Sequence, residues 1–155
     1  MKIEAKFIDT LMEIALEEAN LAQKSGEVPI GAVLGLRGKV IARAHNEMER
    51  QRNATAHAEV LAIGRGGELL GGWRLNDAVL CVTVEPCTMC AGAISLSRIG
   101  TVVFGVADPR LGAYGSLYDI SQDERLGATP RVISGVRENE CRGLMQRFFS
   151  ERRAR

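Results

Sequence analysis

Two short segments hold most of the residue types that can do chemistry. The first is His57-Ala58-Glu59, and the second is Pro86-Cys87-Thr88-Met89-Cys90. Cysteines three positions apart lie on one face of a helix and can bind one metal ion. The start of a helix favours the thiolate, which is the form that binds zinc. Because a Cys-x-x-Cys pair alone is also compatible with redox chemistry, the metal interpretation depends on the histidine.

His57 lies 30 residues before Cys87, which leaves room for one helix and one strand between them. One histidine and the cysteines Cys87 and Cys90 supply three of the four ligands of a tetrahedral zinc ion. Structural zinc sites are closed by a fourth protein ligand, whereas catalytic sites keep that position for water. The other histidine, His45, is a possible fourth ligand, so a closed structural site remains an alternative at this point.

Glu59 favours the catalytic alternative. Zinc lowers the pKa of a bound water towards neutrality, and a nearby carboxylate can take and return that proton. An isolated glutamate in the first turn of a helix would ordinarily only complement the helix dipole. The combination of His-x-Glu with Pro-Cys-x-x-Cys matches the known signature of zinc-dependent nucleobase deaminases.

The surrounding pattern predicts the elements that must position these residues. Hydrophobic periodicity and turn residues predict helices over 4–25, 57–70, 87–97 and 138–153, and strands over 28–35, 39–45, 78–84, 101–106 and 131–135. Residues 37–39 form a hairpin signal, Pro29 is expected near a strand start or edge, and Thr55 is a candidate N-cap. Residues 107–129 are predicted to be a loop with a short helical turn. The alternation predicts one α/β layered domain with a mixed sheet over residues 1–155.

Composition sets the broad class. Hydrophobic residues make up 46% of the 155 residues and charged residues 25%, which is typical of a globular chain. No apolar run is long enough to cross a membrane, and the first residues lack the pattern of a secretory signal, so we expect a cytoplasmic protein. Cys81 lies in an apolar run and is expected in the core, and neither it nor Cys141 is assigned a role.

Charge is distributed unevenly although the net charge is only +1. Residues 1–27 carry three Lys/Arg against six Asp/Glu, and residues 131–155 carry seven Arg against three Glu. Four arginines near the end are a candidate basic patch: Arg147, Arg152, Arg153 and Arg155. A solvated helix face would give the same pattern, so charge alone does not predict a nucleic-acid partner.

Over most of its length the sequence resembles the bacterial tRNA-specific adenosine deaminases. The segments that carry the resemblance are 27–33 (EVPIGAV), Asn46, 55–59 (TAHAE), 83–93 (TVEPCTMCAGA), 98–100 (RIG), 103–105 (VFG), 112–117 (GAYGSL) and Arg147-Phe148-Phe149. The central motifs are shared with the wider cytidine deaminase-like fold, whereas the flanking segments favour the tRNA branch.

The resemblance implies a three-layer α/β/α sandwich around a mixed five-stranded sheet, usually as a homodimer. It implies conversion of adenosine to inosine at the wobble position of a tRNA anticodon stem-loop. One Zn²⁺ per subunit, held by His57, Cys87 and Cys90, would carry the water or hydroxide that attacks C6 of adenine. Glu59 would move protons from this water to ring nitrogen N1 and to the departing ammonia.

The resemblance also implies substrate-binding residues. Asn46 would hydrogen-bond the target base, although an ordinary turn residue would have the same sequence context. Val28 and Pro29 would wall the pocket, and Asp108 and Phe149 would lie near the RNA.

The sequence departs from the family pattern at two places. Many relatives have Asp-Pro where this chain has Asn53-Ala54. An arginine that is common before the aspartate is replaced by Ala107, a change that would weaken RNA contact or shift sequence preference. Neither change affects the zinc or proton chemistry.

Three rival functions remain open from the sequence. A deaminase of a free base or nucleoside, such as guanine or cytosine, would share the catalytic core. A structural zinc module that binds nucleic acid would need a fourth ligand and would not need Glu59. A thiol redox protein would leave His57 and Glu59 unexplained.

Overall fold

The computed structural model describes residues 2–154. Five strands form one mixed sheet in the order β2-β1-β3-β4-β5. The strands are β1 (Gly31–Leu36), β2 (Lys39–His45), β3 (Val79–Val84), β4 (Thr101–Val106) and β5 (Arg131–Ser134). β1 pairs antiparallel with both β2 and β3, while β3–β4 and β4–β5 are parallel.

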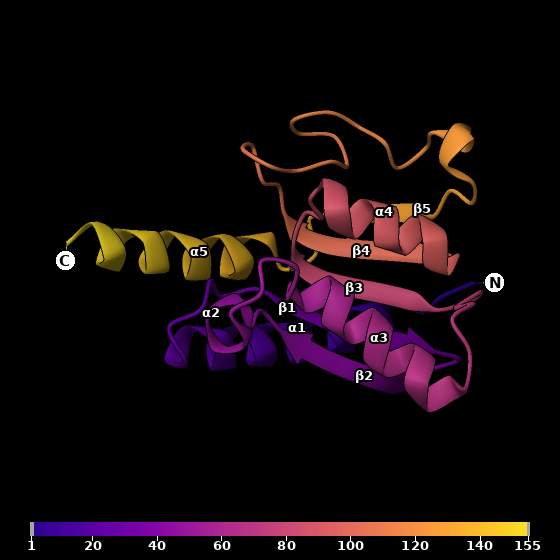
Figure 1. The fold of residues 1–155 in the computed structure, drawn as a ribbon, viewed down its shortest axis with the longest axis horizontal. Helices are drawn as coiled ribbons and strands as arrows, with labels where there is room; N and C mark the ends of the chain where they lie inside the picture. Colours follow the sequence, from indigo (N-terminus) through magenta and orange to yellow (C-terminus); the bar gives the residue numbers. More distant parts are fainter. Residues whose placement is uncertain (1, 155) are drawn as a thin grey trace.

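Helices cover both faces of this sheet, which confirms the predicted three-layer α/β/α architecture. The long helices are α1 (Ala5–Lys24), α3 (Ala58–Leu70), α4 (Thr88–Ser97) and α5 (Glu138–Arg153). α3 and α4 lie side by side over one face, and their first turns point towards the same end of the sheet (Figure 1). α1 and the start of α5 pack on the other face, and α5 then extends beyond that same end.

The alternation of buried strand residues gives each face its own core. In β3, Leu80 and Val82 join the cluster under α3 and α4, with Ala62 and Ile94 from those helices. Cys81, between them, joins the cluster under α1 and α5. A strand that is covered on both faces reads as a continuous apolar run, and all six residues of β3 are buried.

The hairpin between β1 and β2 forms as predicted. Arg37 and Gly38 both adopt positive φ, at 50° and 77°, which is the backbone of the tight turn that suits a two-residue hairpin loop. Strand β1 begins at Gly31 rather than at residue 28. Pro29 has no N–H to give to a ladder and therefore lies just before the strand.

The loop between β2 and α3 differs from the prediction. It contains a one-turn helix, α2 (Met48–Gln51), because the buried carboxylate of Glu27 accepts the backbone N–H groups of Glu49 and Arg50 at 3.0 and 2.9 Å. Thr55 is not the N-cap of α3, which is His57.

The segment after β4 is irregular and contains a short helical turn, as predicted: the 3₁₀ helix η1 (Glu124–Leu126). It passes over the start and length of α4 on its way to β5 (Figure 1). Within residues 2–154, no helix is long and apolar enough to cross a membrane.

Candidate metal centre

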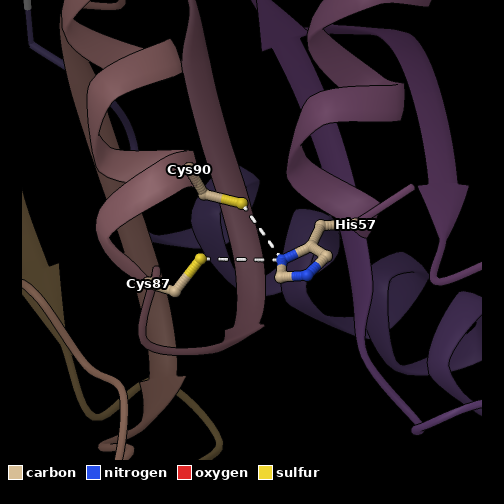
Figure 2. A group of neighbouring side chains, drawn as sticks. All are labelled: His57, Cys87 and Cys90. Atoms are coloured by element: carbon tan, nitrogen blue, oxygen red, sulfur yellow. Dashed lines mark hydrogen bonds between the residues drawn. The ribbon is translucent and has the colours of Figure 1, made fainter. Parts of the chain in front are cut away.

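His57 and the two cysteines come together where α3 and α4 begin. His57 is the N-cap residue of α3, Cys87 is the N-cap residue of α4, and Cys90 lies in the first turn of α4. Figure 2 shows both sulfur atoms facing the same ring nitrogen of His57. The Nδ1 atom is 3.6 Å from Sγ of Cys87 and 3.5 Å from Sγ of Cys90.

These distances fit a tetrahedral zinc ion. Zn–S bonds near 2.3 Å and Zn–N bonds near 2.05 Å at tetrahedral angles place nitrogen and sulfur about 3.6 Å apart. Among residues 2–154, these three side chains form the one group of His, Cys, Asp or Glu whose ligand atoms, all within 4.8 Å of one another, could hold a metal. One imidazole and two soft thiolates form a donor set that suits zinc.

The electrostatics of the cluster support ligation. The neighbouring Cys90 side chain lowers the pKa of Cys87 to about 4, although burial acts against ionisation. The same interaction, together with burial, raises the pKa of Cys90. The cluster therefore favours a thiolate at Cys87, and a metal cation would favour deprotonation of Cys90 as well.

Glu59 lies beside the cluster in the first turn of α3. Its side chain is buried and interacts with Cys90. Burial raises the pKa of Glu59 to about 7, and the negative charge of Cys87 adds to this effect. A carboxyl group with a pKa near neutrality can both accept and give a proton, which is what general acid–base catalysis needs.

Asn46 binds the start of the helix that carries both His57 and Glu59. Its side-chain Oδ1 atom accepts the backbone N–H of Ala58 at 2.8 Å, and its backbone N–H donates to the backbone carbonyl of Ile30. Asn46 is buried, so it connects the end of β2 to the first turn of α3. Since the backbone N–H can only donate, the carbonyl oxygen of the amide must face it and the NH₂ group is left for another acceptor.

The other predicted substrate residues lie on three segments. Val28 and Pro29 immediately precede Ile30, whose carbonyl accepts the backbone N–H of Asn46. Asp108 follows β4, and its Oδ1 atom accepts the backbone N–H groups of Arg110 and Leu111 in a turn.

Phe149 lies on the exposed side of α5, edge-on to Phe148 at a centroid distance of 5.3 Å. It lies on the helix that extends past the end of the sheet where the cluster sits (Figure 1).

The second histidine and the other two cysteines lie away from the cluster. His45 pairs through Nδ1 with Glu18 at 2.9 Å and is not part of the metal-binding group, so it does not act as a fourth ligand. Cys81 and Cys141 are buried on the opposite face of the sheet, beside the sulfur of Met12. Burial raises the pKa of Cys141 to about 12, which makes it an unreactive thiol.

The C-terminal arginines are not all available to a ligand. Arg152 donates to the carbonyl oxygen of Gly26 at 3.0 Å and stacks over the ring of Phe148. It therefore ties α5 to the turn before Val28. Arg147 and Arg153 are exposed, and Arg155 lies outside the described residues.

Of the two departures from the family pattern, Asn53 has a clear local role. Its Oδ1 atom accepts the N–H and the hydroxyl of Thr55 at 2.9 and 2.8 Å. This Asx turn keeps the approach to His57 compact without a proline. Ala107 is exposed, and no contact of its side chain explains the alanine.

Sequence reasoning did not identify three buried glutamates that hold the loops around the site: Glu27, Glu47 and Glu85. Each is a charged residue next to a strand or an apolar segment, which is a signal that the sequence contains. The role of each carboxylate depends on the donors that the fold brings to it, which are backbone N–H groups for Glu27 and Glu85 and side chains for Glu47.

Comparison with known proteins agrees with this geometry. Residues 5–106 match the family described as the cytidine and deoxycytidylate deaminase zinc-binding region. The tRNA-specific adenosine deaminase of Bacillus subtilis is 51% identical over 142 residues, which are 92% of this chain and 88% of that protein.

Solved structures of deaminases share this fold. One from studies of A-to-I editing by tRNA:A34 deaminases superposes with a TM-score of 0.83 at 46% identity, covering 87% of this chain and 98% of that one. A guanine deaminase from Bacillus subtilis has a TM-score of 0.63 at 27% identity, covering 80% and 90%.

The ligand set can be tested by metal analysis. We expect Cys87→Ala to reduce the zinc content of purified protein to roughly one-tenth or less of the wild-type content, because two donors do not hold zinc firmly. Elemental mass spectrometry after dialysis against a weak chelator measures this. Cys81→Ala, which removes a thiol from the other face of the sheet, should keep its zinc. Full zinc occupancy in Cys87→Ala would exclude this residue from the ligand set.

The family match and the full-length relatives therefore show that the chain belongs to the zinc-dependent cytidine and deoxycytidylate deaminase family, and within it to the group of the tRNA-specific adenosine deaminases.

Proposed function

We propose that this protein converts adenosine to inosine at the wobble position of a tRNA anticodon. The main support for deamination chemistry is the cluster of three metal donors with the buried carboxylate of Glu59 beside it. Three protein donors leave one tetrahedral position for water, which is the arrangement of catalytic zinc sites. The relatives named for tRNA adenosine deamination match nearly the whole chain, which supports the choice of substrate.

His57, Cys87 and Cys90 would hold the zinc ion, which when bound supplies a water with a pKa near neutrality. Glu59 would take a proton from this water and give it to N1 of adenine as the oxygen bonds to C6. It would then carry the proton that remains on the added oxygen to the amino group, so that the C6–N bond breaks and ammonia leaves. Burial holds the carboxyl group of Glu59 at a pKa where both transfers are accessible.

Asn46 and the segment before β1 would position the base. With its oxygen occupied by the N–H of Ala58, Asn46 has its NH₂ group left to donate to an acceptor on the purine ring. The half-buried Val28 and the buried Pro29 would form an apolar wall beside it. Asp108 and Phe149 would contact nucleotides around the target, because bases of single-stranded loops are read by splaying them apart and stacking them.

A tRNA substrate also indicates the compartment. None of the four cysteines, all within residues 2–154, forms a disulfide, which suits a reducing environment. We therefore include a cytoplasmic location in the proposal.

A homodimer is part of the same proposal. Trp73, Leu96 and Leu126 are exposed by 55%, 76% and 47% and line one groove across the ends of α3 and α4 and η1. Large apolar side chains gathered on one surface are typical of subunit interfaces. A second copy that packs its α4 against this groove would cover them.

The substrate can be tested by comparing two reactions with zinc-loaded protein. We expect inosine to form in an anticodon stem-loop with adenosine at the wobble position, and no deamination of free adenosine, guanine or cytosine. Mass spectrometry of both reactions measures this. Turnover confined to the free compounds would keep the zinc chemistry and replace the tRNA by a free base or nucleoside.

The role of Glu59 can be separated from metal binding. We expect Glu59→Gln to keep a full zinc content and to lower the rate by about 10²–10⁴-fold or more, because the amide cannot carry a proton. Glu68→Gln, at an exposed position of the same helix, serves as the control and should keep the wild-type rate. A zinc-loaded Glu59→Gln protein that turns over at the normal rate would refute the assignment.

The dimer can be tested by sedimentation equilibrium. We expect wild-type protein to have twice the mass of one chain, and Leu96→Glu to be monomeric because it places a charge in the apolar groove. Leu21→Glu, on the exposed side of α1, should stay dimeric. A dimeric Leu96→Glu protein would move the interface elsewhere.

A further inference from the structure

Glu85 is a buried carboxylate that the proton chemistry does not use. It follows the last residue of β3 and lies two positions before Cys87, and only 4% of it is exposed. Its Oε1 atom accepts the N–H of Asp108 at 3.1 Å and the hydroxyl of Ser116. Its Oε2 atom accepts the N–H groups of Tyr114 at 2.8 Å and Ser116 at 3.2 Å. Both oxygens are thus occupied by neutral donors from one loop.

The loop over residues 108–116 is wrapped tightly around this carboxylate. A Cβ atom added at Gly112 would lie 2.3–2.5 Å from the carboxyl atoms of Glu85, which is closer than real contacts allow. Only glycine therefore leaves room for the side chain of Glu85 at this point of the loop. A buried carboxylate without such hydrogen bonds would be costly, so the contact orders the loop from the inside.

The same loop lies against the turn that carries the metal ligands. Gly112 forms an isolated antiparallel bridge with Cys87, and the N–H of Ala113 donates to the carbonyl of Pro86 at 2.9 Å. On the outer side of the loop, Arg110 and Leu111 are exposed. The loop is therefore fixed at its inner side beside the metal cluster and presents polar and apolar groups to solvent at its outer side.

We propose that Glu85 is a positioning residue that holds the 108–116 loop in place to receive the RNA around the target adenosine. The inference rests on the proposed function. In this proposal, Glu85 determines the affinity for the anticodon loop. The zinc cluster and Glu59 carry out the deamination, and Glu85 takes no part in it. An RNA loop with splayed bases needs a preformed surface, and a loop that moves freely would have to be ordered on binding.

The first test is Glu85→Gln, which keeps the shape and places an NH₂ group against N–H donors. We expect the zinc content to be unchanged, KM for the stem-loop to rise roughly tenfold or more, and kcat to change by less than about threefold. A wild-type KM in a folded, zinc-loaded variant would overturn the proposal. Loss of zinc, or a fall in kcat at constant KM, would overturn it too, because Glu85 would then support the metal helix instead.

The second test uses the contact with Gly112. Gly112→Ala should raise KM on its own, because its Cβ displaces the carboxylate. In a Glu85→Ala background the space is empty, so adding Gly112→Ala should raise KM by no more than about twofold further. Fully additive effects would show that the two residues act separately and would overturn the proposal.

A milder pair keeps the proposal testable if these variants unfold. Ser116→Ala removes one hydroxyl donor to Glu85 and should raise KM less than Glu85→Gln, while Ser116→Thr restores the hydroxyl and should recover affinity. Ser121→Ala removes a buried hydroxyl of the same segment that donates to Asp119 instead, and should leave KM unchanged. A Ser116→Ala protein with wild-type KM would contradict the role of the contact.

Wild-type protein measured in parallel separates this proposal from the function on which it rests. A wild type that does not deaminate the stem-loop would overturn the proposed function. An active wild type beside Glu85 and Ser116 variants of unchanged KM would overturn only the positioning role.

Discussion

The site depends on two helices that begin side by side at one end of the sheet. β1 runs antiparallel to both β2 and β3, so β2 and β3 run in the same direction and their carboxyl ends meet at the same end. α3 follows the end of β2, after the short α2, and α4 follows the end of β3. His57 and Cys87 are the N-cap residues of these helices. The common direction of β2 and β3 therefore brings these two residues together although they are 30 positions apart in the sequence. The two helix starts add positive potential where thiolates must form.

Buried carboxylates hold the irregular loops around the metal cluster in place. A loop beside a metal cluster has backbone N–H groups that no ladder satisfies, and a buried acceptor with several lone pairs can take two or more of them. Glu27 does this for α2, and Glu85 for the loop after β4. Glu47 acts differently, because it accepts from the side chains of Arg50 and Arg65. The loops that would meet the substrate are thus ordered from inside, and their outer residues stay open.

The helices and strands could be predicted from the sequence because the local pattern of apolar and turn residues determines them. The helices over 138–153 and 4–25 and the strand over 101–106 match the structure to within a residue, since periodicity and flanking glycines mark them. The metal cluster was accessible because residue type and spacing alone define a ligand set. Thr55 was a wrong N-cap prediction because Asn53 takes its N–H and hydroxyl, and Asn46, twelve residues before Ala58 in the sequence, binds the first N–H of the helix instead. Such contacts depend on tertiary structure, and no local rule predicts them.

Glu85 connects the part of the chain that the family model matches with the part that lies beyond it. The match to the wider deaminase family covers residues 5–106 and ends with β4, so it contains His57, Glu59 and both metal-binding cysteines. The loop after β4 and α5 lie beyond that match, although the tRNA-specific relatives align over 92% of the chain. Residues beyond 106 can therefore add to the substrate contacts that we propose for Asn46 and the segment before β1. Glu85 lies in the matched part and accepts hydrogen bonds from the loop of the second part, so it physically connects the region of the metal cluster to the segment that we propose receives the RNA.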